Sequence, residues 1–152
     1  MLRPWTLQQY GPSGEAAYQA IVKMIKLRYT LLNYTMEQMA LVAETGLPVN
    51  RPLSFEYPED AQAWKVTDQF MFGAKYMTAP VYHKGARNRS VYFPKVNRSG
   101  GCASWAQYQP AAGGGGANGS TGNSTRRSTF EPGETAVVPV LFDELAMFEC
   151  VQ

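Results

Sequence analysis

The sequence predicts a mixed α and β protein made of two unlike modules, the first helical and the second built from strands. Apolar residues recur at three- and four-residue steps between Ser13 and Thr45, which is the period of an amphipathic helix. After Gly73 the chain turns to short runs rich in β-branched and aromatic residues. The 152 residues are 45% hydrophobic and 17% charged, the composition of a globular chain rather than a disordered one.

A single long helix is predicted from Ser13 to Thr45. Ser13 offers an N-cap and Glu15 an acid in the first turn, where the helix dipole favours negative charge. At the other end, Gly46 can adopt the left-handed conformation that stops a helix, and Pro48 cannot continue one. Both ends of the helix are therefore marked in the sequence.

Five Asn-x-Ser/Thr sequons occur along the chain. They begin at Asn33, Asn88, Asn97, Asn118 and Asn123. Sequons suit the secretory pathway or an extracellular protein, but the first residues lack the apolar stretch of a signal peptide, so the sequence leaves the compartment open. Because glycosylation requires an accessible loop and Asn33 lies inside the predicted packed helix, we expect Asn33 to be bare.

Two short segments are predicted between the helix and Gly73. Residues 47–55 form an extended run after a short turn, as when a helix returns to a parallel sheet or barrel strand. The two prolines of this run would each remove a hydrogen-bond donor, so an isolated sheet would accept it only at an edge. Residues 57–73 begin with acids and end with aromatics, which predicts one or two short helical turns.

The last half of the chain has the pattern of strands around a polar insertion. Residues 76–82 and 89–94, joined by a polar turn that contains glycine, predict a β-hairpin. Residues 111–128 are nearly all Gly, Ala, Ser, Thr and Asn, which bury too little to offset their ordering entropy, so we predict a disordered insertion. A final strand is predicted at residues 134–142, and a short turn or strand at residues 143–148.

Composition excludes several classes of function. A net charge of +2 with scattered basic residues, apart from Arg126 and Arg127, argues against nucleic-acid binding. No apolar run approaches the length of a membrane span. His83 is the only histidine and should be a solvated loop residue. Since no zinc spacing or Gly-rich phosphate loop occurs either, we predict no cofactor and no metal site.

The chain contains two cysteines, Cys102 and Cys150. They are too few for a disulfide framework and have no metal-ligand spacing. They could form at most one bridge, but we favour two unpaired thiols, because free cysteine commonly packs as a small apolar side chain. The sequence alone leaves a Cys102–Cys150 disulfide open.

The acidic residues that follow residues 47–55 are candidates for sugar chemistry. A glycosidase needs two carboxyl groups flanking the scissile bond, about 5 Å apart for retention and roughly 6.5–9.5 Å apart for inversion. Glu56, Glu59 and Asp60 lie where catalytic groups cluster if this run is a barrel strand, and Glu56 is the best placed. We favour a capping role at the following turn, because three acids within five residues cannot easily straddle a sugar.

Asp68 and Arg51 have two interpretations each. Asp68 lies between Trp64 and Phe70, which could form a sugar-stacking platform, but we favour a core-facing turn. Arg51 should pair with Glu56 or with a backbone carbonyl, because a buried arginine without a partner is costly. Six tyrosines are predicted to be structural, on the buried helix face or alternating in strands: Tyr29, Tyr34, Tyr57, Tyr76, Tyr82 and Tyr92.

Residues 28–60 resemble a known family. They run RYTLLNYTMEQMALVAETGLPVNRPLSFEYPED and resemble glycoside hydrolase family 31, whose members carry a similar helix, a Gly-x-Pro, an Arg-Pro-Leu strand and a Pro-x-Asp turn. Similar matches occur at residues 3–5, 64–73, 79–81, 85–87 and 91–94. After Pro94 the chain departs from the family, since residues 105–108 stand where a Trp-x-Asp-x-Trp-Thr-Gly-like turn is usual.

By this resemblance the fold is α/β. Residues 1–73 would be the last helix and eighth strand of a (β/α)8 TIM barrel, and residues 74–152 part of an all-β sandwich, the proximal C-terminal domain. The implied activity is that of a retaining α-glycosidase, a hydrolase of O-glycosyl bonds in α-linked glucosides or xylosides. The family's nucleophile and acid/base aspartates have no matching positions, so we assign no catalytic residue and expect the chain to be inactive alone.

The resemblance also implies partners. A carbohydrate substrate would belong to the full-length parent, and the remainder of the barrel would come in cis or from a partner chain. An eighth of a barrel leaves its strand edge and its apolar helix face exposed. An alternative is a noncatalytic carbohydrate-binding or docking piece that pairs with a separate catalytic chain. A split enzyme reconstituted from two chains is a third hypothesis.

Overall fold

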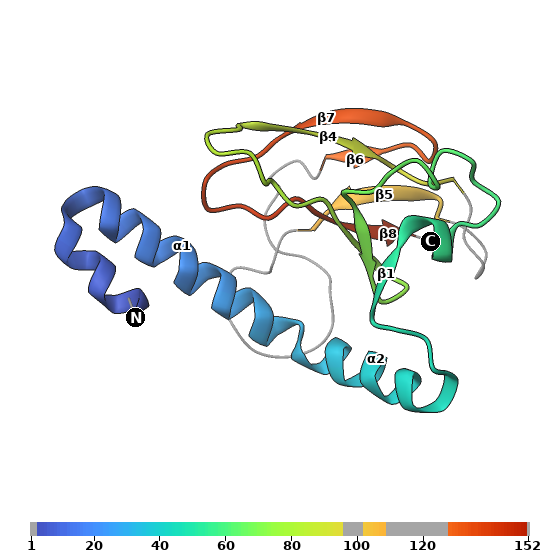
Figure 1. The fold of residues 1–152 in the computed structure, drawn as a ribbon, viewed down its shortest axis with the longest axis horizontal. Helices are drawn as coiled ribbons and strands as arrows, with labels where there is room; N and C mark the ends of the chain where they lie inside the picture. Colours follow the sequence, from blue (N-terminus) through green and yellow to red (C-terminus); the bar gives the residue numbers. More distant parts are fainter. Residues whose placement is uncertain (1–2, 96–101, 109–127, 152) are drawn as a thin grey trace.

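The computed structural model describes residues 3–95, 102–108 and 128–151, and it shows a helical arm beside a group of strands (Figure 1). The helices are η1 (Pro4–Tyr10, a 3-10 helix), α1 (Gly11–Thr30), α2 (Leu32–Thr45) and the short α3 (Leu53–Glu56). The strands are β1 (Asn50–Pro52), β2 (Phe70–Phe72), β3 (Tyr76–Thr78), β4 (Asn88–Tyr92), β5 (Ser104–Gln107), β6 (Thr129–Phe130), β7 (Thr135–Pro139) and β8 (Met147–Val151). The predicted mixed α and β class is confirmed. The predicted disorder of residues 111–128 falls almost entirely outside the described residues.

The predicted helix is present, but it begins earlier and is interrupted at Leu31. Leu31 has φ −91° and ψ 4°, and yet its N–H donates to the carbonyl of Leu27 at 3.2 Å. The hydroxyls of Thr30 and Thr35 donate to the carbonyls of Leu27 and Leu31. Threonine bonds of this kind to the preceding turn bend helices, which accounts for the interruption between α1 and α2.

The two ends of the helical arm differ in how well the sequence predicted them. Because η1 leads directly into α1, Ser13 is not an N-cap, and Glu15 accepts side-chain hydrogen bonds from Gln8 and Gln19. At the other end, Gly46 adopts the left-handed conformation with φ +73° and ψ 2°. The predicted glycine stop is therefore confirmed.

The strands form two antiparallel sheets. One has six strands in the order β1-β2-β3-β8-β5-β6, and the other pairs β4 with β7. The predicted hairpin between residues 76–82 and 89–94 is wrong, because β3 and β4 lie in different sheets. The hairpin occurs one segment earlier, where Gly73 (φ +64°) turns β2 into β3. Phe70–Phe72 is therefore a strand rather than a helical turn, with Met71 fully buried at its centre.

β1 lies at one edge of the six-stranded sheet. Three residues of the predicted run 47–55 form this strand, and the next four form α3. β1 pairs antiparallel with β2, with Arg51 opposite Met71. The edge position predicted from the prolines is confirmed, since Pro52 has no N–H to donate. The assignment of this run to a parallel barrel and the domain boundary at residue 73 stay predictions.

The core draws side chains from both sheets. Its largest fully buried side chains include Trp105, Tyr57, Phe93 and Phe148. The ring of Phe93 stacks on Phe130 with centroids 4.3 Å apart and meets Phe148 edge-on at 5.0 Å. The indole N–H of Trp105 donates to the carbonyl of Pro94 at 3.2 Å, so its polar atom is satisfied inside the core.

A disulfide joins Cys102 to Cys150, so the prediction of two unpaired thiols is wrong. The cysteines are 48 residues apart, but β5 and β8 are hydrogen-bonded neighbours, and their Cα atoms lie 5.3 Å apart. Sequence spacing could not indicate this pair, because it depends on the order of the strands in the sheet. The strand predicted at residues 134–142 is β7, and residues 143–148 lead into β8.

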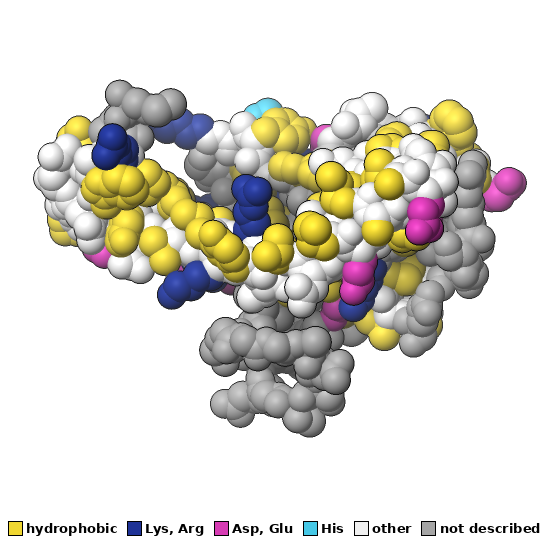
Figure 2. Space-filling view, turned by 90° about the horizontal axis from the view of Figure 1, so that it is seen from below, with side chains coloured by type: hydrophobic (Ala, Val, Ile, Leu, Met, Phe, Trp, Pro, Cys, Tyr) yellow, Lys and Arg dark blue, Asp and Glu magenta, His cyan; other side chains and the backbone are white. Residues whose placement is uncertain are grey.

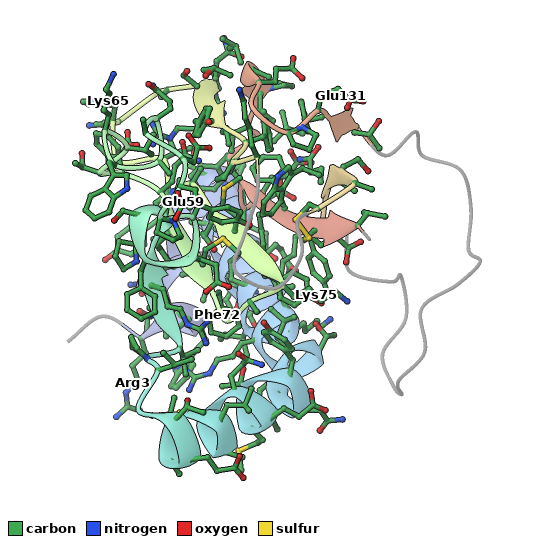
Figure 3. The ribbon with its side chains drawn as sticks, turned by 90° about the vertical axis from the view of Figure 1, so that its right-hand side faces the viewer. Arg3, Glu59, Lys65, Phe72, Lys75 and Glu131 are labelled. Atoms are coloured by element: carbon green, nitrogen blue, oxygen red, sulfur yellow. A yellow bond between two sulfur atoms is a disulfide. The ribbon has the colours of Figure 1, made fainter. Side chains whose placement is uncertain are left out.

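α2 contacts the turn between β2 and β3 through Tyr34. The Tyr34 hydroxyl donates to the carbonyl of Phe72 at 3.1 Å and accepts from the N–H of Lys75 at 3.2 Å. Figure 3 shows both partners on the side of the sheet that faces the helices. The Tyr34 ring lies edge-on to Tyr76, with centroids 4.9 Å apart, and burial raises the pKa of its phenol. A Cβ on Gly73 would overlap Tyr34, so this contact depends on a glycine.

Exposed apolar side chains follow one face of the helical arm, and we call them the apolar stripe. The stripe consists of Ile25, Tyr29, Leu32, Met36 and Met39. Their spacing alternates between four and three residues, which keeps them on one side of a helix. Figure 2 shows hydrophobic side chains in a line along the arm. None of the helices in the described part of the chain is long and apolar enough to cross a membrane.

Candidate functional site

The acids that follow β1 are the sequence-predicted candidates, and Glu56 is paired with Arg51. Both residues are buried, and Arg51 Nη1 donates to Glu56 Oε2 at 2.8 Å. Arg51 Nε also donates to the carbonyl of Pro48 at 2.7 Å, so both of the predicted partners of Arg51 are present. The edge strand β1 and the following α3 place the two charges five residues apart but in direct contact. A buried ion pair of this kind holds Glu56 in a structural role.

Asp60 caps the turn that follows, as predicted, and it also ties this turn to β4. Its Oδ1 accepts from the N–H groups of Gln62 at 3.0 Å and Ala63 at 3.4 Å. Its Oδ2 accepts from the Tyr92 hydroxyl at 2.6 Å and from the N–H of Lys95 at 3.2 Å. All four hydrogen bonds favour the ionised carboxylate, so Asp60 is a structural anion.

The same contacts shift two pKa values in opposite directions. Burial acts to raise the pKa of Asp60, but the hydrogen bonds from Tyr92, Lys95, Gln62 and Ala63 lower it below its ordinary value. Burial is the largest cause that raises the pKa of Tyr92, and the hydrogen bond to Asp60 and its negative charge raise it further. Tyr92 therefore stays protonated and Asp60 ionised at neutral pH.

Glu59 is the exposed member of the three acids. It lines an open hollow together with Asp60, Lys65, Lys95 and Gly133. Figure 3 shows Glu59 and Lys65 on the same side of the molecule. Both charges face solvent, and one exposed carboxylate does not supply the paired carboxyl groups that glycoside hydrolysis requires.

Asp68 lies at the surface, so its predicted place on a core-facing turn is wrong. Its side chain is 37% exposed and forms an ion pair with Arg89, Nη2 to Oδ2, at 2.5 Å. The Tyr82 hydroxyl donates to Oδ2 at 3.2 Å, and the Arg89 guanidinium lies over the Tyr82 ring at 5.3 Å. Burial acts to raise the pKa of Asp68, but the hydrogen bond and charge of Arg89 lower it overall, with help from Tyr82.

The aromatic candidates divide between core and surface. Tyr57, Tyr76 and Tyr92 are buried as predicted, while Tyr29 and Tyr82 are exposed and do not fit the prediction. Trp64 is 63% exposed, and its indole N–H donates to the carbonyl of Pro58 at 2.9 Å. His83 is exposed in a loop, as expected, with its ring 4.5 Å from that of Tyr82.

These geometries limit the chemistry that the described residues can perform. A glycosidase general acid needs a raised pKa so that it is protonated at working pH. Asp60 and Asp68 have lowered pKa values, and Glu56 is bound to a guanidinium. Within residues 3–95, 102–108 and 128–151, no group of three or more His, Cys, Asp or Glu side chains could hold a metal ion. The acids of this region therefore fix the fold of the segment after β1.

Comparison with known proteins identifies the family. The model of the glycosyl hydrolase family 31 C-terminal domain matches residues 46–141. Alpha-glucosidase 2 of Bacillus thermoamyloliquefaciens is 39% identical over 105 residues, which is 69% of this chain and 12% of that protein. Lysosomal alpha-glucosidase of Mus musculus is 38% identical over 82 residues, 54% of this chain and 9% of that protein.

A solved structure agrees with these sequence matches. A family 31 α-xylosidase from a soil metagenome, determined with xylose, has 28% identity and a TM-score of 0.72 over 93% of this chain and 17% of that chain. The chain thus spans a small fraction of the relatives that it matches. The residues that the family model matches include β1, the hairpin at Gly73 and the strands from β4 to β7, so the resemblance seen in the sequence is confirmed. The chain belongs to glycosyl hydrolase family 31.

Proposed function

We propose that this chain is one part of a retaining α-glycosidase that hydrolyses O-glycosyl bonds of α-linked glucosides or xylosides in carbohydrate metabolism. Family membership supports this proposal. The relatives support it as well, since they include an α-glucosidase at 39% identity and an α-xylosidase determined with xylose. This chain covers 12% of that α-glucosidase, so we assign the proposed activity to the whole enzyme and not to this chain by itself.

The chemistry of retention defines what the whole enzyme must supply. One carboxylate attacks the anomeric carbon and forms a covalent glycosyl-enzyme, while a second carboxyl group protonates the leaving oxygen and then activates water. The Arg51–Glu56 pair is the observation that carries our proposal for this chain. Since the best-placed acid is buried and bound to a cation, we propose that the chain alone does not hydrolyse glycosides.

In the whole enzyme, the residues of this chain would serve as scaffold. Residues 1–73 would supply the last helix and eighth strand of the (β/α)8 barrel, and the rest would form part of the adjoining β-sandwich. The apolar stripe supports this arrangement, because Met36 and Tyr29 are 63% and 71% exposed with no partner among the described residues on that face. Burying the stripe against the remainder of the barrel would contribute on the order of 5 kcal/mol.

The test is an assay of the purified chain on chromogenic α-glucosides and α-xylosides. We expect no turnover above the buffer rate, with circular dichroism confirming that the chain is folded. Hydrolysis by the chain alone that Glu56→Gln abolishes, while Glu59→Gln leaves it unchanged, would overturn the proposal. Glu59→Gln is the matched control because Glu59 is exposed and close in sequence.

The apolar stripe also favours a second candidate function, a noncatalytic piece that binds sugar or pairs with a separate catalytic chain. A soluble monomer with measurable oligosaccharide affinity in calorimetry would favour sugar binding. Activity that appears only on mixing with an upstream half of the barrel would favour a split enzyme. Met36→Lys and Met39→Lys lie in the stripe and should block pairing with a separate catalytic chain as well as reconstitution with an upstream half of the barrel. Neither substitution changes Arg51 or Glu56.

A further inference from the structure

The sequon Asn88-Arg89-Ser90 lies at the start of β4 on the surface of the smaller sheet. Asn88 and Ser90 are exposed, whereas Arg89 between them turns inward to its ion pair with Asp68. Alternate side chains of a strand face the same side, so the acceptor amide and the hydroxyl face solvent together. Among residues 3–95, 102–108 and 128–151, neither side chain has a hydrogen-bond partner.

The backbone around this sequon is fixed in a way that leaves the acceptor accessible. β4 pairs with β7 through five residue pairs, beginning with Asn88 opposite Pro139. The N–H of Val140 donates to the carbonyl of Arg87 at 2.8 Å, which anchors the chain just before Asn88. In the described part of the chain β7 is the one strand paired with β4, so a glycan on Asn88 displaces no element of the fold.

The disulfide is an independent observation about the compartment. Cys102 and Cys150 are bonded, and the described residues contain no free cysteine. Disulfides of this kind persist in secreted and endoplasmic-reticulum proteins and are rare where glutathione keeps thiols reduced. Asn-x-Ser/Thr acceptors are glycosylated in that same oxidising pathway. The disulfide and the exposed sequon therefore point to one environment.

We propose that Asn88 is an N-glycosylation site and that the protein matures in an oxidising secretory compartment. The donor would be a lipid-linked oligosaccharide pyrophosphate. The bond between the sugar's anomeric carbon and the phosphate oxygen breaks, and a bond forms between that carbon and Asn88 Nδ2. The amide loses one proton and the lipid pyrophosphate is the leaving group, so the step involves no oxidation. This inference concerns maturation and is independent of the proposed glycosidase activity.

Asn33 provides a matched comparison within the same chain. Its sequon also lies at the surface, but it is part of α2, and the Thr35 hydroxyl donates to the carbonyl of Leu31 at 2.8 Å. Asn33 is also next to Leu32 of the apolar stripe, where a glycan would cover the exposed apolar face. We therefore expect Asn33 to stay unmodified, although it is exposed rather than packed inside the helix as the sequence pattern predicted.

The experiment starts from the natural protein isolated from its own cells. Chymotryptic peptides that contain Asn88 are treated with peptide-N-glycosidase in heavy-oxygen water and analysed by mass spectrometry. We expect Asn88 to be recovered as aspartate with one heavy oxygen, and Cys102 and Cys150 to be recovered as a disulfide-linked peptide pair. Recovery of Asn88 as unmodified asparagine would overturn the proposal, and so would recovery of both cysteines as free thiols.

Variants expressed from the natural gene provide a second measurement. Asn88→Gln and Ser90→Ala should each reduce the mass of the intact protein by one glycan, and Ser90→Thr should retain it. Asn33→Gln should leave the mass of the attached sugar unchanged. All other sequons are kept in every variant, so each difference reports one site. An unchanged sugar mass in both Asn88→Gln and Ser90→Ala would contradict the assignment.

Discussion

Glu56→Ala is the sharpest test of the buried pair after β1. The side chains of Arg51 and Glu56 are 6% and 5% exposed, and their charged atoms lie 2.8 Å apart. Removing Glu56 leaves the guanidinium buried, with the carbonyl of Pro48 as its remaining acceptor among the residues that the structure describes. Removing one partner of a buried pair costs about 3–5 kcal/mol, because the other charge is left uncompensated. This is a large share of the roughly 5–15 kcal/mol that stabilises an ordinary domain.

Urea unfolding followed by tryptophan fluorescence measures this loss, since Trp105 is fully buried in the core. With a denaturant slope of about 1–3 kcal/mol per molar, the unfolding midpoint of Glu56→Ala should fall by roughly 2 M. The double variant Arg51→Met/Glu56→Leu should recover most of the loss, because replacing both charges by apolar groups is often neutral or stabilising.

Two results would refute this account of the pair. One is a Glu56→Ala midpoint equal to that of the unmodified chain, which would show that the carboxylate contributes nothing to the fold. The other is a double variant as unstable as the single one, which would show that the loss comes from Glu56 alone. Glu59→Ala serves as the control, since its side chain is exposed and its midpoint should hardly change.

Three further predictions concern other contacts. Gly73→Ala should lower the free energy of unfolding by about 1–3 kcal/mol, because Gly73 has φ +64° and a Cβ would overlap Tyr34. Thermal unfolding measures this loss. Gly46→Ala is the milder control, because a Cβ at Gly46 would meet open space. Replacing Cys102 and Cys150 by serine should cost about 4 kcal/mol for a separation of 48 residues, measured by urea unfolding; an unchanged midpoint would contradict the bridge. The pKa of Asp60 is lower in the folded chain than its ordinary value. The stability that the Asp60 carboxylate contributes to the fold is therefore complete above about pH 4, and it is lost as the pH falls through the folded pKa. Asp60→Asn should therefore show a weaker loss of stability on acid titration than the unmodified chain, and parallel acid curves would argue against the assignment.

The local features of the fold could be predicted from the sequence. The long helix, its stop at Gly46 and the edge position of the strand with Pro52 follow from periodicity, left-handed glycine and the missing proline N–H. The Arg51–Glu56 pair was predictable for the same reason, since both residues lie within one short segment and a buried charge needs a partner.

The pairing of distant strands could not be predicted in the same way. β3 and β4 are close in sequence, but β3 pairs with β8 as well as with β2, and β4 pairs with β7, so both reach strands in the last part of the chain. The Cys102–Cys150 bridge depends on the same non-local order. Residues 57–73 were predicted to form helical turns from their acidic start and aromatic end, but Phe70–Phe72 is a strand. Three residues are too few to show a strand period, so the pairing with neighbouring strands decides the structure.

The candidate acids show the same division. Asp60 was expected to cap a turn, and two of its hydrogen bonds do so, but its bonds to Tyr92 and Lys95 come from more than thirty residues away. Asp68 was expected in the core because aromatic residues surround it in sequence. Its position is set instead by Arg89 and Tyr82, which hold it at the surface.

The interruption at Leu31 has a mechanical consequence for the arm. α1 has 20 residues and is therefore about 30 Å long, so a rotation of roughly 10° at Leu31 would displace its far end by about 5 Å. Tyr34 fastens α2 to the turn between β2 and β3, whereas α1 forms the exposed Lys23–Asp143 ion pair with the segment between β7 and β8, a type of contact worth about 0–1 kcal/mol. Hydrogen exchange should therefore be faster in α1 than in α2, with the change in rate located at Leu31.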